Sequence, residues 1–268
     1  MPTRTSVGTS TRVWAALLII YVIWGSTYLG IAYAIESIPP FLMAAIRFLI
    51  AGALLVGWDL ARSGRVALPT WRELRDSAVV GALLLGIGNG FVAFGEQTVP
   101  SGIAAILIAM VPVWLSVFGW VYVRDRLPRL VVLGVAIGLL GVVLLVWPFG
   151  GGAPLDLLGI GVLLVAPIGW AHGSLFAARL ARLPRHALTA SGLQMLAGAA
   201  LLFVESLVTG EPARFQPGSV TLTSVLGVAY LVVFGSMVAF STYAWLLRSA
   251  PLSLVGTYAF INPVVAIF

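Results

Sequence analysis

The sequence contains no cysteine, no lysine and few charged residues of either sign. Without cysteine the chain cannot form disulfides, bind a metal through thiolates or use a thiol nucleophile. Without lysine it cannot build a P-loop, whose lysine reaches the nucleotide phosphates, or form a Schiff base. Charged residues make up 9% of the chain and hydrophobic residues 60%, whereas a soluble domain carries roughly 25% charged residues. The composition therefore predicts an integral membrane protein, and we expect neither a metal nor a cofactor.

Nine apolar segments approach the length of a membrane span, which needs about 20 residues. The loops between them are short and leave no room for a soluble catalytic domain. The first segment ends in Ala32-Tyr33-Ala34, which resembles a signal-peptidase site, but it is too long for a typical signal peptide and is expected to stay as a span. We predict all-α spans at 13–34, 38–58, 77–97, 100–123, 129–148, 155–178, 187–208, 221–247 and 250–268.

The arginines are concentrated in alternate loops. Only Arg214 falls in the opposite set of loops, and Arg47 lies inside a span. This asymmetry is the positive-inside pattern, and it predicts a cytoplasmic N-terminus. The net charge of +6 is therefore interpreted as a sign of orientation in the membrane, and we expect no nucleic-acid partner.

A pair of prolines recurs with the same spacing. Pro100 and Pro112 are 12 positions apart, as are Pro251 and Pro263, and one offset of 151 relates the two pairs. Each pair lies in a segment that is apolar enough to span a membrane. Repetition at about half the chain length is typical of transporters built from two related halves.

The repeat divides the chain into 1–149 and 153–268, on either side of a triple-glycine turn at 150–152. Five spans precede the turn, and an odd number inverts the second half relative to the first. Phe268 corresponds to Val117, so the second half is expected to lack its final helix.

Four short motifs carry a resemblance to a known family: Trp24-Gly25-Ser26-Thr27, Ala45-Ile46-Arg47-Phe48, the segment from Pro100 to Pro112, and Ile261-Asn262-Pro263-Val264. They resemble the EamA branch of the drug/metabolite transporter superfamily, and within it amino-acid exporters of the YddG type. The resemblance implies ten spans in two inverted five-helix repeats, nine of them present here. It also implies export of small molecules through a central cavity in the bacterial inner membrane.

Aromatic and polar residues recur at helical spacing within several spans. We predict that spans one, three, four, six, eight and nine surround a cavity and that spans two, five and seven brace it. The alternatives are an aromatic belt at the membrane surface and close helix packing. The candidate substrate-binding residues are Trp24, Tyr28, Asn89, Gln97, Trp170, His172, Tyr243, Tyr258 and Asn262.

Three prolines inside spans are candidate hinges: Pro112, Pro167 and Pro263. Proline removes one backbone hydrogen bond and displaces the carbonyl four residues earlier. Such carbonyls are tolerated at membrane depth against protein or a water-filled cavity. The prolines are thus predicted to bend helices that line the substrate path, with static kinks as the alternative.

Arg47 is a charge within a span and needs a partner, because an unpaired cation costs at least ~2.5–3.5 kcal/mol there. We expect a structural charge paired with carbonyls, Glu96 or Glu205; a substrate carboxylate is the alternative. His172 is interpreted as a hydrogen-bonded residue, with proton relay as the alternative. No acidic residue lies in the middle of a span, which favours facilitated diffusion over proton coupling; the acids at or near the outer boundary are Glu36, Glu96, Asp156, Glu205 and Glu211.

The sequence therefore predicts a transporter that exports small metabolites, with amino acids as the first candidates, by alternating access. Its partners are a small-molecule substrate and the lipid bilayer. One alternative is a proton-coupled efflux carrier for drugs or cationic compounds; an intramembrane enzyme and a passive channel are others. We expect a monomer or a homodimer, the latter through a GxxxG face at Gly134 and Gly138.

Overall fold

The computed structural model describes residues 11–63, 69–124 and 156–267, together with 130, 133, 136, 137 and 140. Most of the predicted fifth span, Gly134, Gly138 and the triple-glycine turn lie outside the described residues. Within the described part, seven helices are long and apolar enough to cross a membrane, and an eighth apolar segment, Leu252–Ala266, is shorter. These eight match the other predicted spans, so the all-α membrane fold is confirmed.

Several spans consist of more than one helical element. Thr70 caps the start of the third span: its hydroxyl oxygen accepts from the Glu73 backbone amide, and the Glu73 carboxylate accepts from the Thr70 backbone amide in return, as in a capping box. The described helices are α1 (Thr11–Ile35), α2 (Pro40–Ser63), α3 (Trp71–Gly81), η1 (Ala82–Gly90), α4 (Phe91–Gly95), α5 (Ser101–Ile108), α6 (Val111–Val123), α8 (Leu157–Arg179), α9 (Ala187–Val208), α10 (Glu211–Arg214), η2 (Pro217–Ser219), α11 (Leu222–Tyr230), η3 (Leu231–Phe240), α12 (Ser241–Ser249), α13 (Leu252–Val255) and α14 (Tyr258–Ile267).

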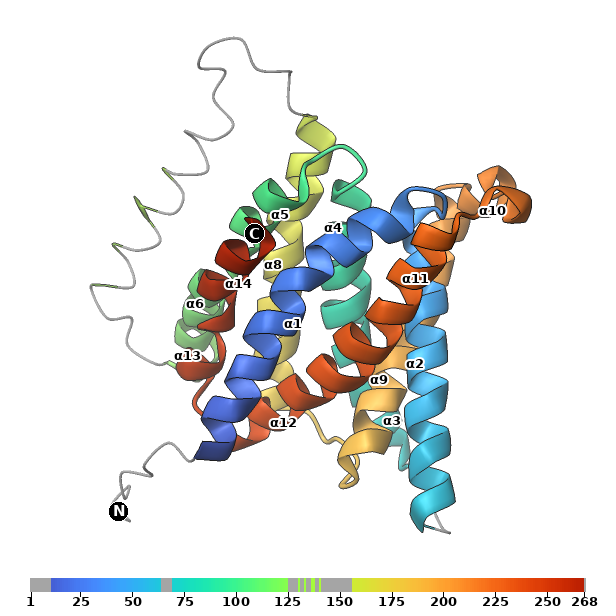
Figure 1. Cartoon of the computed structure of the whole chain (residues 1–268). Helices are drawn as coiled ribbons and strands as arrows, with labels where there is room; N and C mark the ends of the chain where they lie inside the picture. Colours follow the sequence, from blue (N-terminus) through green and yellow to red (C-terminus); the bar gives the residue numbers. More distant parts are fainter. Residues whose placement is uncertain are drawn as a thin grey trace, which may run out of the picture.

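The two halves run in opposite directions through the molecule. In Figure 1, α1 rises from the lower end while its counterpart α8 descends, and α2 descends while α9 rises. The third span (α3, η1 and α4) likewise opposes the eighth (α11, η3 and α12), and α5–α6 opposes α13–α14. The predicted inversion of the repeats is therefore confirmed for these pairs.

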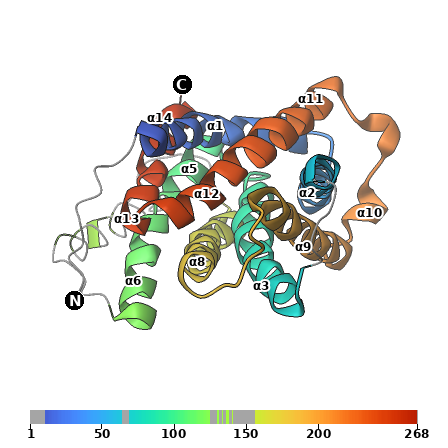
Figure 2. The same cartoon turned by 90° about the horizontal axis from the view of Figure 1, so that it is seen from below.

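The halves interlock through close helix contacts. α2 packs along α9, and Figure 2 shows these two side by side at one end of the bundle. At the crossing, a Cβ on Gly52 would stand 2.8 Å from the carbonyl oxygen of Gly192. A Cβ on Gly81 of α3 would stand 2.2 Å from the carbonyl oxygen of Gln194 on α9. Glycine is required at both positions because backbone meets backbone.

A carboxylate at each end of the α2–α9 pair forms hydrogen bonds that link the two helices. The Glu211 carboxylate, after α9, accepts from the Phe41 and Leu42 amides in the first turn of α2, at 3.2 and 2.7 Å. Near the other end of α2, Asp59 accepts from the Thr189 hydroxyl and pairs with His186. A carboxylate suits a helix N-terminus because the first amides there have no partner within the helix.

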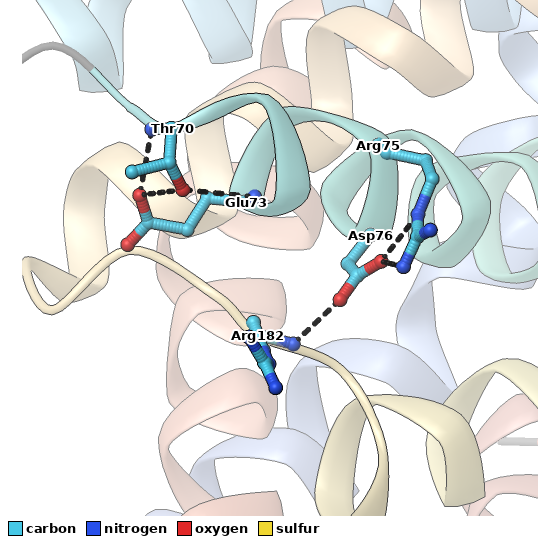
Figure 3. A network of polar contacts seen from close by, with 5 residues as sticks. All are labelled: Thr70, Glu73, Arg75, Asp76 and Arg182. Carbon is cyan, nitrogen blue, oxygen red and sulfur yellow. Dashed lines mark hydrogen bonds and ion pairs between the residues drawn. The ribbon is translucent and has the colours of Figure 1, made fainter.

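The start of α3 is tied to the loop after α8 (Figure 3). Asp76 is buried and accepts from the backbone amide of Arg182 at 2.8 Å and from the Arg75 guanidinium at 2.8 and 2.9 Å. Arg75 and Arg182 lie at the end of the molecule where the sequence predicts the cytoplasm. The third span of one half is thereby fixed to the sixth span of the other.

Candidate functional site

A cavity lies between the two halves, with a volume of about 480 Å³ that includes space open to the surroundings. The lining comes from spans one, three, four, six and nine, so both halves contribute. The residues are Trp24, Thr27, Tyr28, Ile31, Gly88, Asn89, Val92, Ile108, Ala166, Pro167, Trp170, Tyr258 and Asn262.

Four aromatic rings from four spans pack against one another at the cavity, and we call them the aromatic cluster: Trp24, Trp170, Tyr243 and Tyr258. The Trp24 ring centroid lies 5.3 Å from that of Trp170, 4.9 Å from that of Tyr243 and 5.0 Å from that of Tyr258. The contacts with Trp170 and Tyr258 are edge-to-face, and such contacts contribute about 0.5–1.5 kcal/mol each beyond their buried area. The cluster therefore joins spans one, six, eight and nine.

Hydrogen bonds hold the rings of the cluster in place. The Trp24 indole donates to the carbonyl oxygen of Gly235 at 3.2 Å, and the Trp170 indole donates to the Tyr243 hydroxyl at 3.1 Å. That hydroxyl also lies 2.6 Å from the Ser174 hydroxyl. The polar tips of Trp24, Trp170 and Tyr243 are thus satisfied by protein groups.

The third and eighth spans each change to a π-helix in their interior, at η1 and η3. Single π segments often mark functional positions, because the extra residue per turn re-aims side chains. η1 carries Gly88 and Asn89 of the cavity lining, and η3 carries Gly235 and Ser236. The sequence analysis missed both segments.

Arg47 is 2% exposed and lies beside the cavity. Its Nε donates to the Ser236 hydroxyl at 2.8 Å and its Nη1 donates to the side-chain oxygen of Asn89 at 3.3 Å. The guanidinium carbon lies 4.6 Å from the Phe48 ring centroid. In the described part of the chain these groups take the place of Glu96 and Glu205, the acidic partners that the sequence suggested.

Most of the predicted binding residues meet at the cavity, and three do not line it. Tyr243 belongs to the aromatic cluster. Gln97 follows the end of α4, where its amide is exposed and donates to the carbonyl oxygen of Phe94. His172 faces α6 and packs between the rings of Phe118 and Tyr122.

The candidate hinge prolines occupy different positions. Pro167 lies inside α8 and lines the cavity. Pro263 lies inside α14, one residue after Asn262. Pro112 lies in the first turn of α6, after a break between α5 and α6, and not in the middle of a continuous helix. Its missing amide hydrogen costs nothing there, because the first turn has no partner for it.

Two buried polar groups near the cavity have no hydrogen-bond partner among the described residues. Asn262 is 2% exposed and its side-chain oxygen is unsatisfied. Glu96 is 9% exposed, and both of its carboxylate oxygens are unsatisfied. Buried polar groups are normally paired, so each points to a ligand, a proton or another state of the protein.

Several lining residues were not predicted: Thr27, Ile31, Gly88, Val92, Ile108 and Ala166. Most are small or apolar, so nothing in the sequence separates them from residues that face lipid. Thr27 directly follows the Trp24-Gly25-Ser26 motif, which was the one available signal. No group of three or more His, Asp or Glu residues within the described ranges is placed to hold a metal.

Comparison with known proteins agrees with this architecture. The model of the EamA-like transporter family matches residues 12–147 and 157–268. The chain is 40% identical over 256 residues to the uncharacterized inner membrane transporter YedA of Escherichia coli K12, covering 95% of this chain and 80% of YedA.

More distant relatives share the same length of alignment. A probable amino-acid metabolite efflux pump of Escherichia coli K12 is 25% identical, over 89% of this chain and 81% of its own. A solved crystal structure at 24% identity has the same fold, with a TM-score of 0.67 over 95% of this chain and 85% of that one. With both halves matched, this chain is a membrane transporter that belongs to the EamA-like transporter family.

Proposed function

We propose that this transporter exports small metabolites, amino acids first among them, through the central cavity. The observation that carries the proposal is the lining itself, in which the aromatic faces of Trp24 and Tyr258 stand beside the amides of Asn89 and Asn262. Such a lining suits a small solute with an apolar or aromatic part and a polar end. The similarity to a probable amino-acid metabolite efflux pump supports the same substrate class.

The proposed mechanism is alternating access. Two inverted halves with a site between them can exchange conformations, so that the site opens first to one side of the membrane and then to the other. Pro112, Pro167 and Pro263 are the proposed hinges. Net flux follows the substrate gradient, which makes the process facilitated diffusion.

By analogy with YedA, we place the protein in the inner membrane, with the N-terminus in the cytoplasm. It acts as a monomer or a homodimer and catalyses no chemical reaction. A passive channel is distinguished by electrical conductance without saturable exchange.

Counterflow into liposomes tests the substrate class. Purified protein is reconstituted into vesicles loaded with threonine, phenylalanine or tryptophan, and entry of the labelled amino acid is followed. Saturable entry that requires the internal amino acid is expected. If no amino acid exchanges while another metabolite does, the substrate class is wrong.

Glu96 favours a second candidate, a proton-coupled efflux carrier for cationic compounds. An unpaired buried carboxylate is the group that proton-driven carriers use to bind a proton. A pH gradient imposed on the same vesicles decides between the candidates. Facilitated diffusion predicts no accumulation driven by the gradient, in the wild type or in Glu96→Gln. Proton coupling predicts accumulation that Glu96→Gln abolishes.

A further inference from the structure

The two amides in the cavity are in different hydrogen-bonding states. The side-chain oxygen of Asn89 is occupied by Arg47 Nη1 at 3.3 Å, so the cavity-lining part of that amide is its N–H donors. The side-chain oxygen of Asn262 is buried and lacks a partner within the described stretches. The residues that line the cavity therefore include an amide donor on the third span and, on the ninth, a buried acceptor without a partner among the described residues.

Arg47 determines which way Asn89 faces. A guanidinium has five donors and no acceptor, so it can bind only the oxygen of an amide and never its nitrogen. Arg47 is itself held by Ser236 and the Phe48 ring. Gly235 leaves room for it, since a Cβ there would stand 2.8 Å from Arg47 Nη2. These contacts make Arg47 a fixed support for the donor.

The Arg47 charge also favours an anion beside Asn89. Arg47 is buried and does not line the cavity, so it acts through Asn89 and through its field. On the ninth span, an ammonium group matches the unsatisfied oxygen of Asn262, and the faces of Trp24 and Tyr258, which also line the cavity, attract cations. The two amides thus have opposite preferences.

We infer that the cavity is a polarised site for a free α-amino acid, in which Asn89 binds the carboxylate, Asn262 binds the ammonium group and Arg47 is the positioning residue. This inference rests on the proposed function and adds to it that both charged groups of the substrate are required. Amines without a carboxylate and acids without an amine are poor substrates.

Three probes that share one ring test this requirement: phenylalanine, phenethylamine, which lacks the carboxylate, and 3-phenylpropionate, which lacks the amine. Counterflow of each is measured in liposomes that contain the wild-type protein. Phenylalanine should exchange at least tenfold faster than either analogue. Comparable exchange of all three overturns this inference alone, whereas exchange of no amino acid in the panel of threonine, phenylalanine and tryptophan also removes the proposed function.

Asn89→Asp replaces the donors with acceptors and lets the new carboxylate pair with Arg47. It should lower phenylalanine exchange at least tenfold and raise the ratio of phenethylamine to phenylalanine exchange. Gln97→Glu is the matched control, because it makes the same kind of change just after the same span, at an exposed amide outside the cavity. The control should keep the wild-type ratio.

Asn262→Leu tests the other amide and keeps the inference testable if Asn89→Asp does not fold. It removes the acceptor, so the preference for phenylalanine over 3-phenylpropionate should fall at least fivefold. Arg47→Lys keeps the charge but lacks the planar guanidinium whose separate nitrogens bind Ser236 and Asn89. It should raise the KM for phenylalanine more than it lowers the maximal rate. Variants that lower the exchange of all probes equally, with unchanged ratios, contradict the inference.

Discussion

The fourth and ninth spans begin alike and break differently. Pro100 and Pro251 each stand directly before the first helix of their span, α5 and α13. In the fourth span the break falls after Ile108, just before Pro112. In the ninth it falls after Val255, and Pro263 lies within the continuous α14. The same proline spacing therefore exists in two conformations within one molecule.

This difference is what alternating access by inverted halves requires. If each half can adopt either form, an exchange of the two forms between the halves moves the opening of the cavity from one side of the membrane to the other. The proline spacing alone does not select the form, because both spans share it. Gly256, at the break in the ninth span, has Leu115 and Pro112 of the fourth span as neighbours.

The largest expected effect is the loss of stability when a glycine at a helix crossing between the halves is replaced. Gly81→Ala places a methyl group against the carbonyl oxygen of Gln194, where only backbone could move aside. We expect a loss of about 2–3 kcal/mol of stability, as for other overpacked sites. Thermal unfolding in detergent measures it. Gly57→Ala is the control, because nothing lies within 4 Å of the added Cβ.

Gly57→Ala should leave stability unchanged or raise it by about 0.5–1 kcal/mol, since alanine favours the helix. Equal melting temperatures for the two glycine variants would show that the crossing of α3 and α9 is looser than described.

The two carboxylates at the ends of the α2–α9 pair, Glu211 and Asp59, should contribute different amounts to stability. Glu211→Gln weakens bonds to two buried backbone amides that have no other acceptor, and we expect a loss of about 1.5–3 kcal/mol. Asp59→Asn should cost less, because two of the groups that bind its carboxylate, the Thr189 hydroxyl and the His186 ring, are side chains that can turn to other acceptors. Thermal unfolding of both variants tests the order. A larger loss for Asp59→Asn would contradict it.

The proline pair should affect transport more than stability. Pro112→Ala and Pro263→Ala are each expected to slow counterflow about tenfold, since each proline serves as a hinge in one of the two forms. Pro112→Ala should change stability by less than about 1 kcal/mol, because a helix first turn accepts proline and alanine alike. Pro217→Ala, in η2, is the control and should transport normally. If only Pro263→Ala slows transport, the two halves do not exchange forms.

The smallest effect concerns Asp156, at the start of α8. Its carboxylate accepts from the Thr98 hydroxyl at 2.8 Å and from the Gly159 and Leu158 amides at 3.1 Å. These hydrogen bonds, the one from Thr98 first, lower the pKa of Asp156 below its usual range.

Because the pKa of Asp156 is depressed in the folded state, its stabilisation is complete at neutral pH and is lost as pH falls below about 4. The wild type should therefore lose more stability between pH 6 and pH 3 than Asp156→Asn does, by unfolding measurements. If the stability of both proteins depended on pH in the same way, the ionised Asp156 carboxylate would not stabilise the fold.

The spans, their inversion and most of the cavity aromatics were predictable from the sequence, because apolar length, an odd span count and helical periodicity determine them. The third span shows where that reasoning stops. A regular α-helix would place Gly86, Asn89 and Gly90 on one face, but the π segment shifts the faces. Gly86 and Gly90 therefore pack against Leu201 and Leu202 of α9, while Asn89 lines the cavity.

Gln97 and His172 were misplaced for related reasons. The third span ends before Gln97, so the direction of the Gln97 side chain cannot be extrapolated from the helical faces of that span. His172 is two positions from Trp170, which puts it on the opposite side of α8. The partners of Arg47 could not be predicted either, because Ser236 comes from a distant span whose rotation depends on η3.

Accessibility of the cavity from each side of the membrane is the most direct test of alternating access. The chain has no cysteine, so Val92→Cys places a single thiol in the cavity lining. An impermeant thiol reagent is added from one side of oriented vesicles and then from the other, with and without amino acid. The account predicts labelling from both sides, slowed by substrate. A thiol that is never labelled from one side, under any substrate condition, would contradict it.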